Sequence, residues 1–124
     1  MCSYKGSNYS KEYKVIKNLS TVVENRAYCY RILKSQFINL QGNIVQAYGI
    51  EIEKIEMINN EVISIERDMV EYISPILHKV SNLLSKLHSN NVSPIHLTDV
   101  IGEYVDDYVS DFDGFSINKA SNYN

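Results

Sequence analysis

Hydrophobic and polar positions divide the chain into two parts. Up to about residue 72 the apolar positions alternate with a period of two, as in β-strands, and beyond it they recur with helical spacing. The period-two segments, separated by turn residues, span 26–38, 44–57 and 61–69. The apolar pattern over 12–23 fits either a short strand or an irregular edge segment. This part therefore predicts an antiparallel β-meander of three to four strands.

The turns between these segments carry residues that tolerate a positive φ. Leu40-Gln41-Gly42-Asn43 provides the first reversal and Asn59-Asn60 the second. The small residues Ala47 and Gly49 in the middle of one strand indicate a close approach by a helix or a β-bulge.

Two amphipathic helices are expected in the second part, because the same four-residue pattern occurs twice. It reads Ile73-Ser74-Pro75-Ile76 and Val92-Ser93-Pro94-Ile95. A Ser at the N-cap accepts a hydrogen bond from a free backbone N–H, and Pro suits the first helical position. The two apolar stripes consist of Ile76, Leu77, Val80, Leu83, Leu84 and Leu87, and of Leu97, Val100, Ile101, Tyr104, Val105, Tyr108 and Val109. The first helix should end at Ser89-Asn90-Asn91.

The predicted fold class is α+β, an antiparallel three- to four-stranded β-meander followed by two amphipathic helices packed on one face. With 124 residues the chain is long enough for one core. We expect a disordered lead over 1–11, a single α+β domain over 12–110 and a flexible acidic tail over 111–124.

Charge argues against direct nucleic-acid binding. The net charge is −3, and the 12 basic residues are scattered among 15 acidic ones, whereas binding to a phosphate backbone needs Lys and Arg gathered on one face. The strand tyrosines Tyr28, Tyr30 and Tyr48 could stack on single-stranded bases. However, acidic residues oppose the nearby basic ones, so packing under the helices is the better interpretation. The opposing sets are Arg26, Arg31 and Lys34, and Glu51, Glu53 and Glu56.

The location expected is the cytoplasm. No apolar run reaches the roughly 20 residues that span a bilayer, and the first residues lack the apolar stretch of a secretion signal. The two cysteines, Cys2 and Cys29, do not form a disulfide framework, and we expect both to be reduced thiols.

A family resemblance rests on three short motifs. These are Tyr48-Gly49-Ile50-Glu51 within a strand, a Ser-Pro helix start, and the segment from Val92 to Ile101 that reads VSPIHLTDVI. Over roughly Tyr28 to Tyr108 the chain resembles a clostridial family of small proteins that is described only as a domain of unknown function. The resemblance implies a cytoplasmic bacterial protein with strands followed by helices, and it implies no activity, cofactor or catalytic residue. The family often has an acidic residue where Gly102 stands here.

Candidate chemistry is sparse. His96, Asp99 and Glu103 are spaced at i, i+3 and i+7, as metal ligands on a helix can be, but a structural site needs four ligands. We therefore expect no metal and no cofactor. The chain has no Gly-rich phosphate loop and no Gly-x-Ser-x-Gly motif. The alternative to a binding module is a small-ligand-binding protein or enzyme with Cys29 or His96 in a pocket.

The aromatic and acidic residues of the second helix favour a partner surface. Tyr and Phe bury a large area at low entropic cost. The residues expected to bind a partner are Tyr104, Tyr108, Phe112, Glu103 and Asp107. We therefore expect a non-enzymatic protein–protein interaction module, a small bacterial regulatory adaptor that docks on a larger protein or forms a homodimer. The larger protein could be a DNA-acting enzyme, such as a recombinase or the transcription machinery, in a mobile element or sporulation programme.

Overall fold

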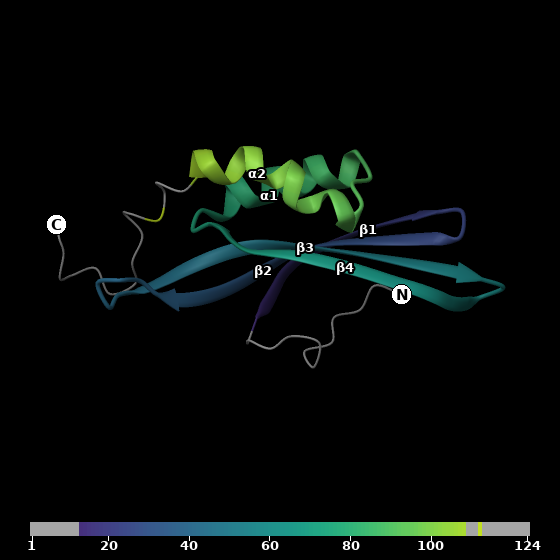
Figure 1. Cartoon of the computed structure of the whole chain (residues 1–124), viewed down its shortest axis with the longest axis horizontal. Helices are drawn as coiled ribbons and strands as arrows, with labels where there is room; N and C mark the ends of the chain where they lie inside the picture. Colours follow the sequence, from purple (N-terminus) through teal and green to yellow (C-terminus); the bar gives the residue numbers. More distant parts are fainter. Residues whose placement is uncertain (1–12, 109–111, 113–124) are drawn as a thin grey trace.

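The computed structural model describes residues 13–108 and Phe112, and it has two layers (Figure 1). One layer is an antiparallel sheet with the strand order β1-β2-β3-β4. Its strands are β1 (Lys14–Val23), β2 (Arg26–Ile38), β3 (Ile44–Ile58) and β4 (Glu61–Ser74). The other layer consists of α1 (Leu77–Ser89), the 3₁₀ turn η2 (Pro94–His96) and α2 (Leu97–Tyr108).

This architecture confirms the predicted α+β fold, a β-meander followed by two helices. The segment 12–23, for which a strand was one of two possibilities, contains β1, so the sheet has four strands. The sheet is longer than the helical layer, so both of its ends extend beyond the helices (Figure 1). The lead predicted over 1–11 and the tail predicted over 111–124, Phe112 excepted, lie outside the described residues.

The predicted turns form where the sequence places them. Asn39 accepts backbone hydrogen bonds from Gln41 and Asn43 through its side-chain oxygen, both at 3.0 Å, and Gly42 adopts a φ of 85°. Asn59 and Asn60 have φ values of 53° and 68°. Two consecutive positive φ values match the twist of the flanking strands, which explains why asparagine suits this tight hairpin.

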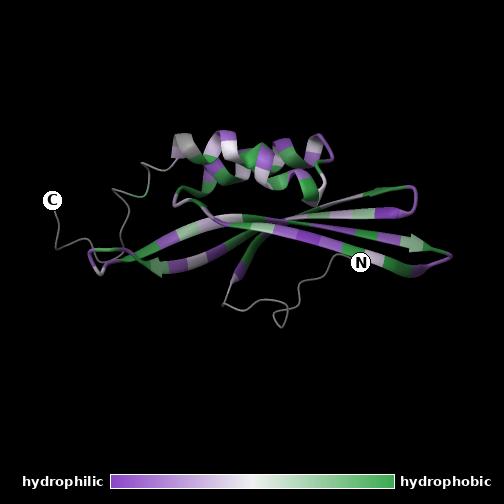
Figure 2. Cartoon of the chain, in the orientation of Figure 1, coloured by the Kyte–Doolittle hydropathy of each residue, from purple (hydrophilic) through white to green (hydrophobic). Residues whose placement is uncertain are grey.

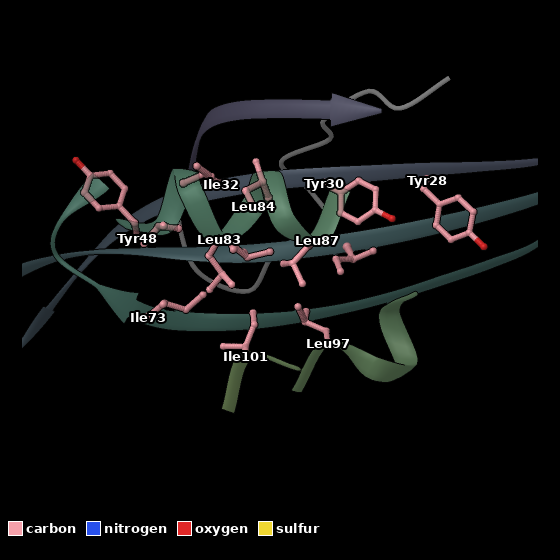
Figure 3. Close-up of a cluster of buried hydrophobic side chains, with 13 residues drawn as sticks. Tyr28, Tyr30, Ile32, Tyr48, Ile73, Leu83, Leu84, Leu87, Leu97 and Ile101 are labelled. Atoms are coloured by element: carbon pink, nitrogen blue, oxygen red, sulfur yellow. The ribbon is translucent and has the colours of Figure 1, made fainter. Parts of the chain in front are cut away.

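The core lies between the sheet and the helices. Six even-numbered residues of β2 and β3 form a core cluster with leucines of α1 and with Leu97 and Ile101 of α2 (Figure 3); they are Tyr28, Tyr30, Ile32, Tyr48, Ile50 and Ile52. Tyr30 is fully buried and donates a hydrogen bond to the carbonyl oxygen of Val92 at 2.9 Å. Burial, and then the neighbouring Tyr28, raise the pKa of Tyr30. Because Tyr28, Tyr30 and Tyr48 are all buried, the alternative of a base-stacking platform is wrong.

The two helix starts differ from the prediction. α1 begins at Leu77 instead of directly after Ser74, since Ser74 is the last residue of β4 and pairs with Tyr48. The Ser74 hydroxyl still accepts the backbone N–H of Ile76 at 3.0 Å, so it closes the turn before the helix. At the second start Pro94 occupies the first helical position, but that turn is 3₁₀ and Ser93 makes no side-chain cap. The end of α1 at Ser89 is confirmed.

β4 extends five residues beyond the predicted segment and bends near its end. The pairing with β3 is shifted between Tyr48 and Ile50. A Cβ on Gly49 would overlap the backbone carbonyl oxygens of Val70 and Glu71. Gly49 therefore allows β4 to approach at a bulge, which confirms the bulge interpretation of this glycine.

Candidate interaction surface

The residues predicted to bind a partner are distributed over two clusters. Tyr104 and Tyr108 of α2 lie together, with ring centroids 6.4 Å apart, and are partly buried against the core. Two lysines of α1 cover these rings, Lys86 over Tyr104 and Lys79 over Tyr108, each 5.1 Å from the centroid. Part of each tyrosine therefore stabilises the contact between the two helices by a cation–π interaction.

The other predicted partner residues lie outside that pair. Phe112 packs against Phe37 of β2, with ring centroids 5.8 Å apart, and Phe37 in turn contacts Tyr72 of β4 at 4.8 Å. Glu103 is exposed on α2, and Asp107 lies on the same helix although its side chain is not among those described. The structure thus brings Tyr104 and Tyr108 together and associates Phe112 with the sheet.

The alternative was a small-ligand-binding protein or enzyme with Cys29 or His96 in a pocket. Cys29 is completely buried and forms a disulfide, so the expectation of a reduced thiol at this position is wrong. The other cysteine, Cys2, lies outside the described residues. His96 is exposed in η2, on the helical layer, whereas Cys29 is in the sheet. A nucleophilic Cys needs a free thiolate, which this Cys29 does not provide.

The helical spacing considered for metal ligands at His96, Asp99 and Glu103 is not realised in the structure. His96 ends a 3₁₀ turn, while Asp99 and Glu103 belong to α2, so the three residues do not follow one regular helix. Among the described residues, no three His, Cys, Asp or Glu side chains are grouped so that they could hold a metal ion.

A surface that the sequence analysis missed lies at the end of the sheet beyond the helices, where the β1–β2 and β3–β4 turns meet. The backbone N–H of Met57 donates to the carbonyl oxygen of Asn25 at 2.9 Å and ties the two turns together. Figure 2 shows hydrophobic segments on the strands at this end. Six aliphatic side chains are between 42% and 65% exposed, and we name them the aliphatic end: Val22, Val23, Ile58, Val62, Ile63 and Ile65.

The two faces of this end differ in polarity. One row of paired residues crosses all four strands on the face opposite the helices, and it is entirely apolar. Its outer members Val22 and Ile65 are exposed, and its inner members Ala27 and Ile55 are buried. The neighbouring positions on the helix side carry ion pairs, Arg26 with Glu56 at 3.3 Å and Lys54 with Glu66 at 3.2 Å. The sequence signal for this surface is the adjacent aliphatic pairs beside the turns, Val22-Val23 and Val62-Ile63. A half-buried strand can cover only one member of such a pair.

Next to the apolar row, the face opposite the helices carries a buried network of charges. Arg31 of β2 binds Glu51 at 2.8 Å and Glu53 at 2.9 Å, both on β3. Arg67 of β4 binds Glu53 and lies 3.9 Å from Glu51. Arg31, Glu51 and Glu53 are each less than 10% exposed. The two arginines alternate with the two glutamates, so each buried charge has opposite neighbours.

Hydrogen bonds within this network set the direction of the pKa shifts of Arg31 and Glu53. Burial lowers the pKa of Arg31, but the hydrogen bonds with Glu53 and Glu51 outweigh it, and the net pKa is raised. Burial likewise raises the pKa of Glu53, but hydrogen bonds from Arg67 and Arg31 bring it below its ordinary value. Arg31 and Glu53 are therefore charged at neutral pH, as a structural ion network requires.

The structure defines a two-layer α+β protein with an aliphatic end on its sheet and, among its described residues, no group of side chains that could hold a metal ion. The chain belongs to a family of unknown function, DUF6514, whose model matches residues 10–107. The chain matches no curated protein and no solved structure. Within the described residues no helix has both the length and the apolar character needed to cross a membrane.

Proposed function

We propose that the protein is a non-enzymatic protein–protein interaction module, a small regulatory adaptor that docks on a larger protein. The single observation that carries the proposal is the aliphatic end, six exposed aliphatic side chains gathered at one end of the sheet. Exposed aliphatic side chains gathered at one end of a small protein mark an interaction site, because their contact with water is unfavourable. The clostridial source, the bacterial cytoplasm and the adaptor role expected from the sequence all belong to this proposal.

The aliphatic end is the main docking surface in this proposal, and the second helix is subsidiary. Lys86 and Lys79 of the same chain lie over the rings of Tyr104 and Tyr108, so only part of each ring is accessible to a partner. The exposed Glu103 and the neighbouring Asp107 keep the role predicted from the sequence, an acidic rim that favours a basic partner surface. No feature of the described residues points to a DNA-acting partner, so the proposal stops at a protein partner.

Affinity capture from a clostridial lysate with three matched proteins tests the proposal. The test variant is Val22→Asp/Ile65→Asp, which charges both outer members of the apolar row. The control is Ile95→Asp, since Ile95 is 77% exposed and lies on η2, in the helical layer. Melting temperatures first establish that all three proteins are folded.

We expect the wild type and the control to retain the same protein at a fixed stoichiometry, and the double variant to retain at least about tenfold less. Crosslinks between that protein and the aliphatic end would locate the contact. Equal capture by all three proteins would overturn the proposal, as would the absence of any stoichiometric partner. Sedimentation of the wild type alone tests whether the partner is a second copy, because the double variant should then return a dimer to the monomer mass.

A further inference from the structure

The two edges of the sheet are protected to different degrees. An edge strand leaves a row of backbone N–H and C=O groups open to another strand, and proteins commonly block it with lysines, prolines or bulges. β1 has Lys14 and Lys17 and a register shift between Val15 and Lys17. β4 contains neither Lys nor Pro, and it pairs with β3 without interruption from Ser64 to Val70. We name Ser64–Val70 the open edge.

The outer side of the open edge is accessible. β4 is the last strand of the sheet, and no backbone hydrogen bond joins the open edge to a segment other than β3 within the described chain. Ile65 is 54% exposed, and the Glu66 side chain is 53% exposed. An extended segment could therefore add to the sheet here through main-chain hydrogen bonds, as in β-strand addition.

Charge decides which segment fits. On the helix side the open edge presents the carboxylates of Glu66 and Asp68, since their partners on β3 are Lys54 and Ile52. On the opposite side it presents Ile65, Arg67 and Met69. A strand with the complementary pattern has aliphatic, basic, acidic, basic and aliphatic residues in succession. This pattern reads the same in both directions, so it fits a parallel or an antiparallel addition.

The internal contacts of these charges leave room for a partner. Lys54 binds Oε1 of Glu66, and Arg67 reaches Glu53 and Glu51 while 34% of its side chain stays exposed. Asp68 accepts the backbone N–H of Met69 at 2.8 Å and lies 3.5 Å from the Thr98 hydroxyl. Cross-strand pairs of opposite charge stabilise neighbouring strands, and like charges destabilise them.

A second copy fits this edge poorly. When two open edges pair antiparallel with full overlap, Arg67 lies opposite Arg67, and Glu66 lies opposite Asp68 of the other copy. These like-charge contacts disfavour a symmetric continuous sheet. The side chain added opposite Ile65 would instead extend the apolar row, so the open edge and the aliphatic end form one continuous surface.

We propose that the open edge, Ser64–Val70, binds an extended segment of a partner protein with the pattern aliphatic-basic-acidic-basic-aliphatic, by β-strand addition. This inference rests on the proposed function and specifies the partner chemistry of the same surface. The specificity comes from Glu66, Arg67 and Asp68, and the affinity comes from the main chain and from the aliphatic contacts with Ile65 and Met69.

Two capped seven-residue peptides of the sequences Thr-Val-Lys-Glu-Lys-Val-Thr and Thr-Val-Glu-Lys-Glu-Val-Thr test the inference with the full chain. Titration followed by amide NMR should show the first peptide binding at least about tenfold more tightly than the second, with shifts concentrated on Ser64–Val70. The variant Glu66→Lys/Asp68→Lys should reverse this preference. The control Asn82→Lys adds a charge at an exposed position of α1 and should leave both affinities unchanged.

The outcomes separate this inference from the proposed function. If neither peptide binds, or if the charge variant does not reverse the preference, the strand-addition inference is wrong. Capture that still depends on Val22 and Ile65 would then leave the proposed function standing. If the open edge of a second copy occupies the site, shown by a doubled mass and competition by the peptides, the inference is also overturned.

Discussion

Both faces of β2 and β3 are buried, but only the face opposite the helices buries a cluster of charged side chains. On the helix side, Tyr30, Ile32 and Ile50 are fully buried among apolar side chains. On the other side, Arg31 and Glu51 are only 2% and 1% exposed, and they are held by ion pairs. Apolar burial is tolerant of small changes in shape, whereas a buried charge depends on each of its partners. The first face should therefore lose stability gradually on substitution, and the second abruptly.

The largest effect is expected from Arg31→Met. This substitution leaves Glu51 and Glu53 buried beside a single arginine, and breaking a buried ion pair on one side costs about 3–5 kcal/mol. Urea unfolding measures the loss. The control is Arg26→Met, because the Arg26–Glu56 pair has side chains 51% and 30% exposed, and such a pair contributes about 0–1 kcal/mol. Equal losses for both variants would contradict the contrast between buried and exposed pairs.

On the helix side, Leu84→Ala should cost about 2–5 kcal/mol, since it removes a fully buried side chain and leaves a cavity. Leu77→Ala on the same helix is the matched control, because Leu77 is 38% exposed and should lose less. Both free energies of unfolding come from the same urea titrations. If Leu77→Ala were as damaging as Leu84→Ala, the helical layer would not pack as described.

A third test concerns the close approach of backbones on the charged face. Gly49→Ala should cost about 1–3 kcal/mol, since its Cβ would overlap the carbonyl oxygens of Val70 and Glu71. Gly102→Ala in α2 meets no atom within 4 Å and should instead gain up to about 1 kcal/mol from helix propensity. Opposite changes in melting temperature are expected. A neutral Gly49→Ala would mean that β4 does not approach at this point.

The smallest expected effect is the change in the free energy of unfolding as the pH is lowered. The pKa of Glu53 is lowered in the folded state, so its contribution to stability is present above the unfolded value of about 4.3 and is lost as the pH falls through the lower folded value. The free energy of unfolding should therefore decline between about pH 5 and pH 2. Glu53→Gln should be less stable at neutral pH and show a shallower decline.

The control for the acid experiment is Glu66→Gln, because the Glu66 side chain is 53% exposed. At neutral pH it should lose less stability than Glu53→Gln, because an exposed ion pair contributes little. An unchanged slope in Glu53→Gln would show that the network does not contribute to acid sensitivity.

The fold was predictable from the sequence because its signals are local. The period of the apolar positions identifies the strands and helices, and the asparagine turns set the hairpins. The bounds of β4 and the helix starts were less accurate, since Ser74 both pairs with Tyr48 and closes the following turn. A Ser-Pro pair in sequence does not distinguish these roles.

The candidate surface was predicted less well than the fold. Charged residues such as Glu51 and Glu53 have the pattern of a solvated face, and only the pairing of three strands shows that Arg31 and Arg67 bury them. The aromatic residues of α2 were predicted to bind a partner, but Lys79 and Lys86 of the same chain cover part of their rings. The aliphatic end requires knowing where the helices stop covering the sheet, which no local pattern gives.

The simple strand order has a consequence for how the molecule is made. Every strand pairs with its neighbour in sequence, so each hairpin can close soon after it leaves the ribosome, and such local topology favours rapid folding. The helices are synthesised after β4, which ends at Ser74. Synthesis proceeds at about 5–20 residues per second. The tyrosine-bearing face of the nascent sheet therefore remains exposed to solvent for seconds, until the helices that cover it have been made. During that interval the nascent chain exposes an apolar face that the folded protein buries.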